Sequence, residues 1–143
     1  MAAPYNDLLS KLEEAAKAVI DGLALAGVKV NTGLEDEKLA LPYVVCSAVS
    51  STEEIIDTGL HRVKLRIVVA SDADAHQLAA HRERVAPVFA ELRQDDIEAT
   101  LSAKVEDFDV TFVREEGQSV EHEGRRLKNV LELDAVCCGL DLT

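Results

Sequence analysis

The 143-residue sequence predicts an α+β fold, with two main helices packed on antiparallel sheet. Apolar residues recur every three or four positions in two segments, as they do on one face of a helix. In other segments they recur at every second position, as they do on one face of a strand. The expected order of elements is α-β-β-β-α-(short α)-β-β, with the last two strands forming a long C-terminal hairpin.

The first helix is expected over residues 6–26. Asn6 or Asp7 would cap its first free amides, and Gly27 would end it in the left-handed conformation. Charged residues take the face opposite the apolar one. The apolar face consists of Leu8, Leu9, Leu12, Ala15, Ala16, Val19, Ile20 and Leu23.

Three strands are expected next. A short one at residues 28–30 precedes a polar loop at 31–38. A β-branched run at 41–49 has Pro42 at its entry, where a missing amide does least harm to a sheet. The third run, 62–69, alternates cleanly, so its apolar residues face the core while Arg62, Lys64 and Arg66 face away from it. We expect these cations to pair with carboxylates or to meet a partner subunit, with anion binding as the less favoured alternative.

The second helix is expected to be capped by Ser71 or Asp72 and to run to about Leu92. Pro87 removes one backbone hydrogen bond, which predicts a kink or break near Val85. A short helical turn would follow from Asp95 to about residue 103. The apolar side of the second helix is expected to comprise Leu78, Ala79, Val85, Phe89 and Leu92.

Residues 107–113 and 125–138 are expected to pair as the hairpin. A register with Phe112 opposite Leu127 and Phe108 opposite Leu131 would keep the apolar side chains on one face. The intervening segment, 114–124, is polar and too long for a tight turn. It is therefore expected to project from the body as a loop.

The formal charge of −12 arises from 27 acidic and 15 basic side chains. Such a surface repels phosphate backbones and disfavours specific nucleic-acid binding, although DNA could slide past it. The sequence shows no secretion leader and no apolar run near the ~20 residues that span a bilayer, which predicts a cytosolic protein. The cysteines Cys46, Cys137 and Cys138 fall in strand sequence, where thiols behave as small hydrophobes.

No catalytic or cofactor motif is recognisable, so we expect neither an enzyme nor a bound cofactor or metal. His76 and His81 are five residues apart on the second helix, which places them on different sides. His61 and His122 lack partners at metal-binding spacing. A small metal-dependent enzyme or ligand-binding domain that uses His76, His81 and nearby carboxylates remains the alternative from another class.

Three segments together resemble a known family: RVKLRIVVASDAD at 62–74, HRERV at 81–85, and the end from Phe108 to Leu142 with FDV, REEG, EGRRL, LEL and CGLDL in order. The chain resembles the tail-terminator, or tail-completion, neck proteins of long-tailed bacteriophages. The resemblance implies one domain over 1–143 that forms a homo-oligomeric ring, usually of six subunits. Such a ring caps the tail tube, ends its polymerisation and offers a surface to the head. A head-completion or connector protein of the neck is the alternative.

The implied partners are other copies of the chain, the tail-tube protein and the head-tail connector. DNA would pass through the ring, and the protein would occupy the host cytoplasm and then the virion. The projecting segment 114–124 and the loops at 31–38 and 50–59 are the candidate segments for subunit or tube contact. Ordinary solvated connections are the alternative for each of them. The candidate subunit or tube interface comprises Arg62, Lys64, Arg66, Arg114, Glu115, Glu116, Gln118, Glu121, Glu123, Arg125 and Arg126.

Overall fold

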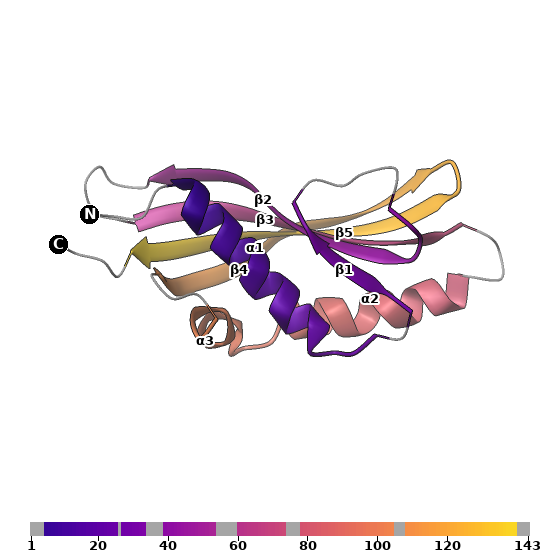
Figure 1. Ribbon diagram of the computed structural model, residues 1–143, viewed down its shortest axis with the longest axis horizontal. Helices are drawn as coiled ribbons and strands as arrows, with labels where there is room; N and C mark the ends of the chain where they lie inside the picture. The colour runs from indigo at the N-terminus through magenta and orange to yellow at the C-terminus, as the bar shows by residue number, and fades with distance from the viewer. Residues whose placement is uncertain are drawn as a thin grey trace.

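The order of elements in the computed structural model confirms the predicted α+β class. Residues 5–25, 27–33, 39–53, 60–73, 78–104 and 108–139 are described. The elements in chain order are α1 (Tyr5–Asp21), β1 (Lys29–Thr32), β2 (Tyr43–Glu53), β3 (Leu60–Asp72), α2 (Leu78–Leu92), α3 (Ile97–Ser102), β4 (Phe108–Glu123) and β5 (Arg126–Gly139) (Figure 1).

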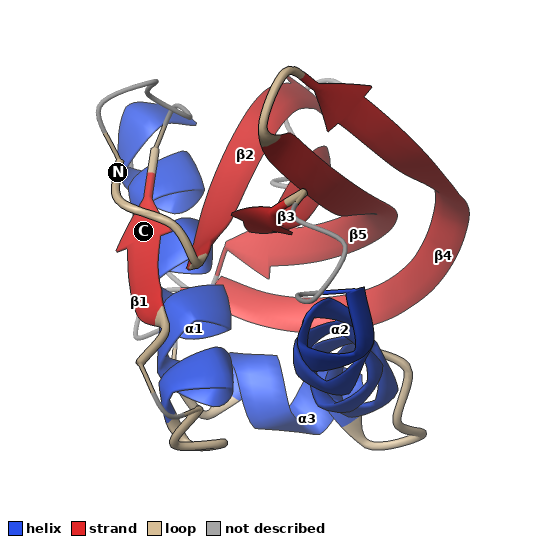
Figure 2. Cartoon of the chain, turned by 90° about the vertical axis from the view of Figure 1, so that its right-hand side faces the viewer, coloured by secondary structure: helices blue, strands red, loops and turns tan. Residues whose placement is uncertain are grey.

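The described strands form one sheet in the order β1-β2-β3-β5-β4. Only the pair β1 and β2 is parallel among them, while the other neighbours are antiparallel. The described helices lie together on one side of the sheet, and the sheet is strongly curved (Figure 2). The β4–β5 hairpin bends away from α2 toward its tip (Figures 1 and 2). One sheet face is therefore covered by helices, and the other, called here the helix-free face, is not.

The main core lies between the helices and the covered face of the sheet. Val63, Leu65, Ile67 and Val69 of β3 are all at most 1% exposed, which confirms the predicted alternation on this strand. Each fully buried side chain of this size stabilises the fold by about 1.5–3 kcal/mol relative to leaving it in water. A second, smaller apolar cluster lies on the helix-free face and consists of Tyr43, Val45 and Ala70, with Leu39 and Leu41 packed against it.

Helix α1 ends five residues earlier than predicted, at Asp21 rather than near residue 26. Leu23 and Leu25 lie beyond the helix but still pack against the core. The connection after the helix therefore continues the apolar spacing from which a longer helix was predicted. Gly27 does take a positive φ of 71°, as predicted, but it lies beyond the helix end, after Ala24 has also taken a positive φ of 50°.

Helix α2 also differs from the prediction at its start. Ser71 and Asp72 do not cap it, because they continue β3 and pair with Leu127 and Arg126 of β5. The helix is continuous through Pro87, so the predicted break is absent.

The side chains of α2 that face the core are also only partly the predicted ones. Leu78 is 39% exposed and Ala79 is exposed, whereas the buried side chains are His81, Val88, Phe89 and Leu92. The expected second-helix stripe was therefore correct only in its C-terminal half.

The C-terminal hairpin exists, but its predicted loop and register are wrong. Residues 114–123 continue β4, and the chain reverses at Gly124, which has a φ of 58°. Phe112 pairs with Val136 instead of Leu127, and Phe112 is 48% exposed. Polar residues are tolerated here because β4 is an edge strand, and a two-residue turn accepts glycine at positive φ.

Two bulges adjust the register of β4 against β5. They lie between Val110 and Phe112 and between Glu115 and Gly117, so Thr111 and Glu116 have no Cα partner.

The short strand β1 and the short helix α3 were both predicted, although Asn31 and Thr32 belong to β1 rather than to a loop. Residues 34–38 and 54–59, which cover most of the two predicted contact loops, lie outside the described residues. None of the described helices has the length and hydropathy that a bilayer crossing requires.

Candidate interaction surface

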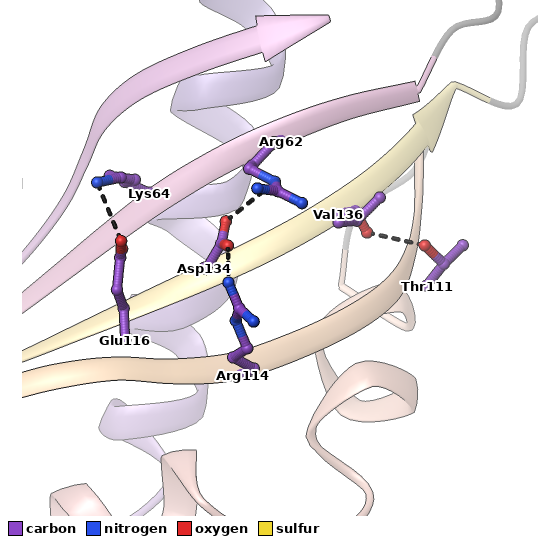
Figure 3. A network of polar contacts seen from close by, with 7 residues as sticks. All are labelled: Arg62, Lys64, Thr111, Arg114, Glu116, Asp134 and Val136. Atoms are coloured by element: carbon purple, nitrogen blue, oxygen red, sulfur yellow. Dashed lines mark hydrogen bonds and ion pairs between the residues drawn. The ribbon is translucent and has the colours of Figure 1, made fainter. Parts of the chain in front are cut away.

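The helix-free face carries a network of charges centred on Asp134 of β5. Arg62 on β3 places Nε 3.7 Å from Asp134 Oδ1, and Arg114 on β4 donates from Nη2 to Asp134 Oδ2 at 3.2 Å. Two arginines from the flanking strands thus share one carboxylate on the strand between them (Figure 3). The Asp134 side chain is only 5% exposed, whereas those of Arg62 and Arg114 are 47% and 57% exposed.

Two further ion pairs cross from β3 to β4 over the intervening β5. Lys64 Nζ lies 3.2 Å from Glu116 Oε1, and Arg66 Nη2 lies 3.7 Å from Glu121 Oε1. Glu116 is the extra residue of the second β4 bulge. At the first bulge, Thr111 Oγ1 donates to the Val136 carbonyl oxygen at 3.0 Å (Figure 3). The predicted pairing of the β3 cations with neighbouring carboxylates is therefore confirmed.

The hairpin tip is held by a contact within the hairpin and by contacts to β3 and β2. Glu123 accepts from Lys128 Nζ at 3.0 Å, and Arg125 donates to Asp72 at 3.2 Å. Arg126 donates to Tyr43 Oη at 3.1 Å, and its guanidinium carbon lies 5.7 Å from the centre of the Tyr43 ring.

The remaining candidate residues, Glu115 and Gln118, contact the helix layer instead. Arg93 near the end of α2 donates from Nε to Glu115 Oε1 at 2.6 Å and from Nη2 to Gln118 Oε1 at 3.0 Å. The Arg93 guanidinium also lies over Phe89, 5.3 Å from the ring centre. The candidate interface residues therefore divide between two surfaces of the hairpin.

Sequence reasoning missed Asp134, Lys128 and Arg93 as members of these networks. A signal for Asp134 was present, because it alternates with Leu133 and Ala135 and must point away from the helices. Its two arginine partners depend on strand order and register, which the sequence pattern did not provide.

A buried polar chain joins α2 to the sheet. His81, 2% exposed, contacts Ser71 Oγ through Nδ1 at 2.8 Å and Asn129 Oδ1 through Nε2 at 2.7 Å. An amide oxygen only accepts, so His81 Nε2 carries the hydrogen of that bond. Arg84 Nη1 donates to the same Ser71 hydroxyl at 3.0 Å. His81 was expected to be exposed or locally bonded, and it is in fact buried with partners on two strands.

Ser71, His81 and Asn129 are the residue types of a nucleophile, a base and an orienting amide. They are not accessible to a substrate in the way that catalytic groups must be. Ser71 is fully buried, so its hydroxyl cannot reach a substrate from solvent. Both ring nitrogens of His81 already have protein partners. Among the described residues no cluster of His, Cys, Asp and Glu has the arrangement of a metal site. His76, the other histidine of the metal-site alternative, lies outside the described residues.

Cys46 and Cys137 are buried and form no disulfide, in agreement with the sequence prediction. Burial raises the pKa of the Cys46 thiol to about 12, and the negative charges of Asp21 and Glu13 act in the same direction. A thiol that remains protonated at neutral pH is a poor nucleophile, so Cys46 acts as a core residue.

A groove of about 530 Å³ runs between α2 and the β4–β5 hairpin. Val85, Ala86, Phe89 and Ala90 of α2 form its apolar lining. Its polar lining consists of Arg82, Arg93, Gln118 and Asn129.

No protein-family model matches the sequence, and no curated protein matches it. The fold, in contrast, is similar to that of a chain in a solved structure titled "Virion of native gene transfer agent (GTA) particle". The superposition has a TM-score of 0.63 at 17% sequence identity and covers 93% of this chain and 94% of the other. The chain therefore shares the fold of a chain of that virion over nearly its whole length.

Proposed function

We propose that the protein is a structural component of a phage-like particle, and specifically a tail terminator. Its subunits would form a ring that caps the tail tube, ends polymerisation and provides the surface for head attachment. The observation that carries this proposal is the fold shared with a virion chain over 93% of this chain and 94% of that chain. Coverage this complete on both sides supports a single domain over residues 1–143 with the role of a whole subunit.

The potentially reactive side chains are buried and engaged inside the fold, which supports a structural role rather than a catalytic one. His81 bonds to Ser71 and to Asn129 inside the fold, and the Cys46 thiol is buried. A closed ring needs one surface patch to contact a different patch on the next copy, with no chemistry at either. We therefore propose that the protein is not an enzyme and acts without a cofactor.

The charged residues of β3 and of the β4–β5 hairpin are proposed as the subunit or tube interface. Their ion pairs are mostly exposed, for example 44% and 37% for the Lys64 and Glu116 side chains, so each pair is weak in isolation. A charged side chain of such an exposed pair can replace its partner within the chain by an opposite charge on another chain at little free-energy cost. The net charge of −12 would allow DNA to pass through the ring without being held.

Sedimentation velocity of the purified chain, alone and mixed with the tail-tube protein of the same particle, tests this function. We expect a ring-sized species that forms alone or only with tube protein, and tubes with capped ends and limited length in negative-stain images. A chain that stays monomeric with tube protein present and leaves tube length unchanged would contradict the proposal.

Two other outcomes would assign a different role. Binding to the isolated head connector without any effect on tube length would indicate a head-completion protein of the neck. Stoichiometric zinc, manganese or iron retained through dialysis, measured by elemental analysis, would indicate a metal-dependent enzyme or ligand-binding domain.

A further inference from the structure

The groove between α2 and the hairpin has a floor of aliphatic and aromatic carbon. Phe89 is 4% exposed, and Val85 is half-buried next to it. Ala86 and Ala90 are exposed, and their small side chains leave the groove open between the helix and β4. Its volume of about 530 Å³ lies within the range of roughly 300–1,000 Å³ that is usual for ligand sites.

The amides in the groove are oriented so that they present hydrogen-bond donors. Asn129 Oδ1 accepts from His81, and Gln118 Oε1 accepts from Arg93, so both amide oxygens are already engaged. The –NH2 group of each side chain is then left for a ligand. His81 and Arg93 thus hold the two amides with their –NH2 groups available to the groove before a ligand binds. Arg93 is itself held by Glu115.

The charge of the groove is opposite to that of the chain as a whole. Its charged lining residues are Arg82 and Arg93, and none of its lining residues is acidic, although acidic side chains outnumber basic ones by 27 to 15 in the sequence. Arg93 is paired with Glu115, whereas Arg82 forms no ion pair within the part of the chain that the structure describes. Arg82 is exposed and is the guanidinium available to an incoming carboxylate.

We propose that this groove binds an aliphatic peptide segment of a partner protein that carries a carboxylate. The aliphatic side chains would pack on Phe89 and Val85, and the carboxylate would pair with Arg82. Peptide carbonyl oxygens would accept from the amides of Gln118 and Asn129. The chemistry of the groove is independent of the role in tail assembly proposed above, so either proposal can fail alone.

Nuclear magnetic resonance with the full 15N-labelled chain tests this directly. The probe is acetyl-Leu-Asp-Leu-Asp-Leu-amide, and the matched control replaces both aspartates with asparagine. We expect saturable shifts of the Gln118 and Asn129 side-chain amide signals with the acidic peptide, and binding at least about tenfold weaker with the control, because the charge-assisted bonds to Arg82 are lost.

Variants separate groove binding from general effects. Arg82→Gln should weaken the acidic peptide about five- to tenfold, and Ala90→Trp should abolish binding by filling the groove. Ala79→Trp places the same bulk on an exposed position of α2 outside the groove and should change nothing. Equal binding of acidic and neutral peptides, no shift at either amide, or no effect of Arg82→Gln would overturn the proposal. Shifts at these amides that depend on protein concentration without peptide would also overturn it, in favour of a second copy as the occupant.

Discussion

The two faces of the central sheet carry different chemistry although the same strands build both. On β5, Leu131, Leu133 and Ala135 point toward the helices and are at most 1% exposed. The residues between them include Glu132 and Asp134, which point to the helix-free face. Asp134 is held there by arginines on both neighbouring strands.

The difference shows that two kinds of free energy maintain one sheet. Burial on the covered face is non-directional and scales with area, so any well-packed set of aliphatic side chains would serve. On the helix-free face, the ion pairs around Asp134 act at defined distances, and their strength falls steeply with exposure to water. The cluster of Tyr43, Val45 and Ala70 is buried on the same face, so burial contributes there as well. The covered face therefore carries the larger apolar core, and the charged part of the helix-free face is where the chain can exchange partners.

The largest effect is expected from truncation on the covered face. Leu131→Ala should lower the free energy of unfolding by about 2–5 kcal/mol, because it removes buried area and leaves a cavity. The matched change on the other face, Val136→Ala, removes a half-buried side chain and should cost less than about 1 kcal/mol. Urea denaturation followed by circular dichroism measures both, and equal losses would mean that the faces do not differ in this way.

The covered face was also the more predictable one. Alternation on β3 fixes which side chains point together, so Val63, Leu65, Ile67 and Val69 were correctly assigned to the core before strand order was known. Helix α3 and strand β1 were likewise predicted from local pattern and turn residues. These predictions succeed because the signal lies within a few residues of the feature.

The helix-free face could not be predicted in the same way. The hairpin register was inferred from Phe108, Phe112, Leu127 and Leu131, and the structure pairs Phe112 with Val136. A polar edge strand gives no periodic signal, and the bulges at Thr111 and Glu116 shift the pairing twice. The ion pairs follow from that register, so an error in it removes every partner assignment. The buried His81 was missed because its hydrogen-bond partners, Ser71 and Asn129, lie on strands that only the fold brings to it.

Removing the two arginines that pair with Asp134 is expected to destabilise the fold more than removing the Asp134 carboxylate. The double change Arg62→Met with Arg114→Met leaves a carboxylate with a side chain 5% exposed and without its cations, and should cost about 2–4 kcal/mol. Asp134→Asn leaves only well-solvated arginines and should cost about 1 kcal/mol. Lys104→Met, at an exposed residue outside the network, is the control and should be neutral within about 0.5 kcal/mol. If Asp134→Asn proved the more damaging variant, the carboxylate would not be the buried member that determines the energy.

Titration of Cys46 probes the covered face. Its folded pKa, about 12, lies above the ordinary value of 9.0, so folding favours the protonated thiol. This contribution is fully present below pH 9 and is lost as the pH rises from there toward 12, because the unfolded chain ionises first. Between pH 9 and 10 the wild-type chain should lose about 1 kcal/mol more unfolding free energy than Cys46→Val, which lacks the thiol. Parallel pH profiles in urea denaturation would show that Cys46 is accessible to water in the folded state.

The smallest effect is expected for the exposed pair Lys64 and Glu116 on the helix-free face. A double-mutant cycle with Lys64→Gln and Glu116→Gln should give a coupling below about 1 kcal/mol, because both side chains are more than a third exposed. The coupling should nearly vanish in 1 M salt, where the screening length falls to about 3 Å. A cycle on Arg66 and Glu121, whose charged atoms are 3.7 Å apart, should behave in the same way. A larger coupling that resists salt would mean that water is excluded from this face, which in solution requires another chain to cover it. The concentration dependence of the coupling would then identify a second copy as that cover.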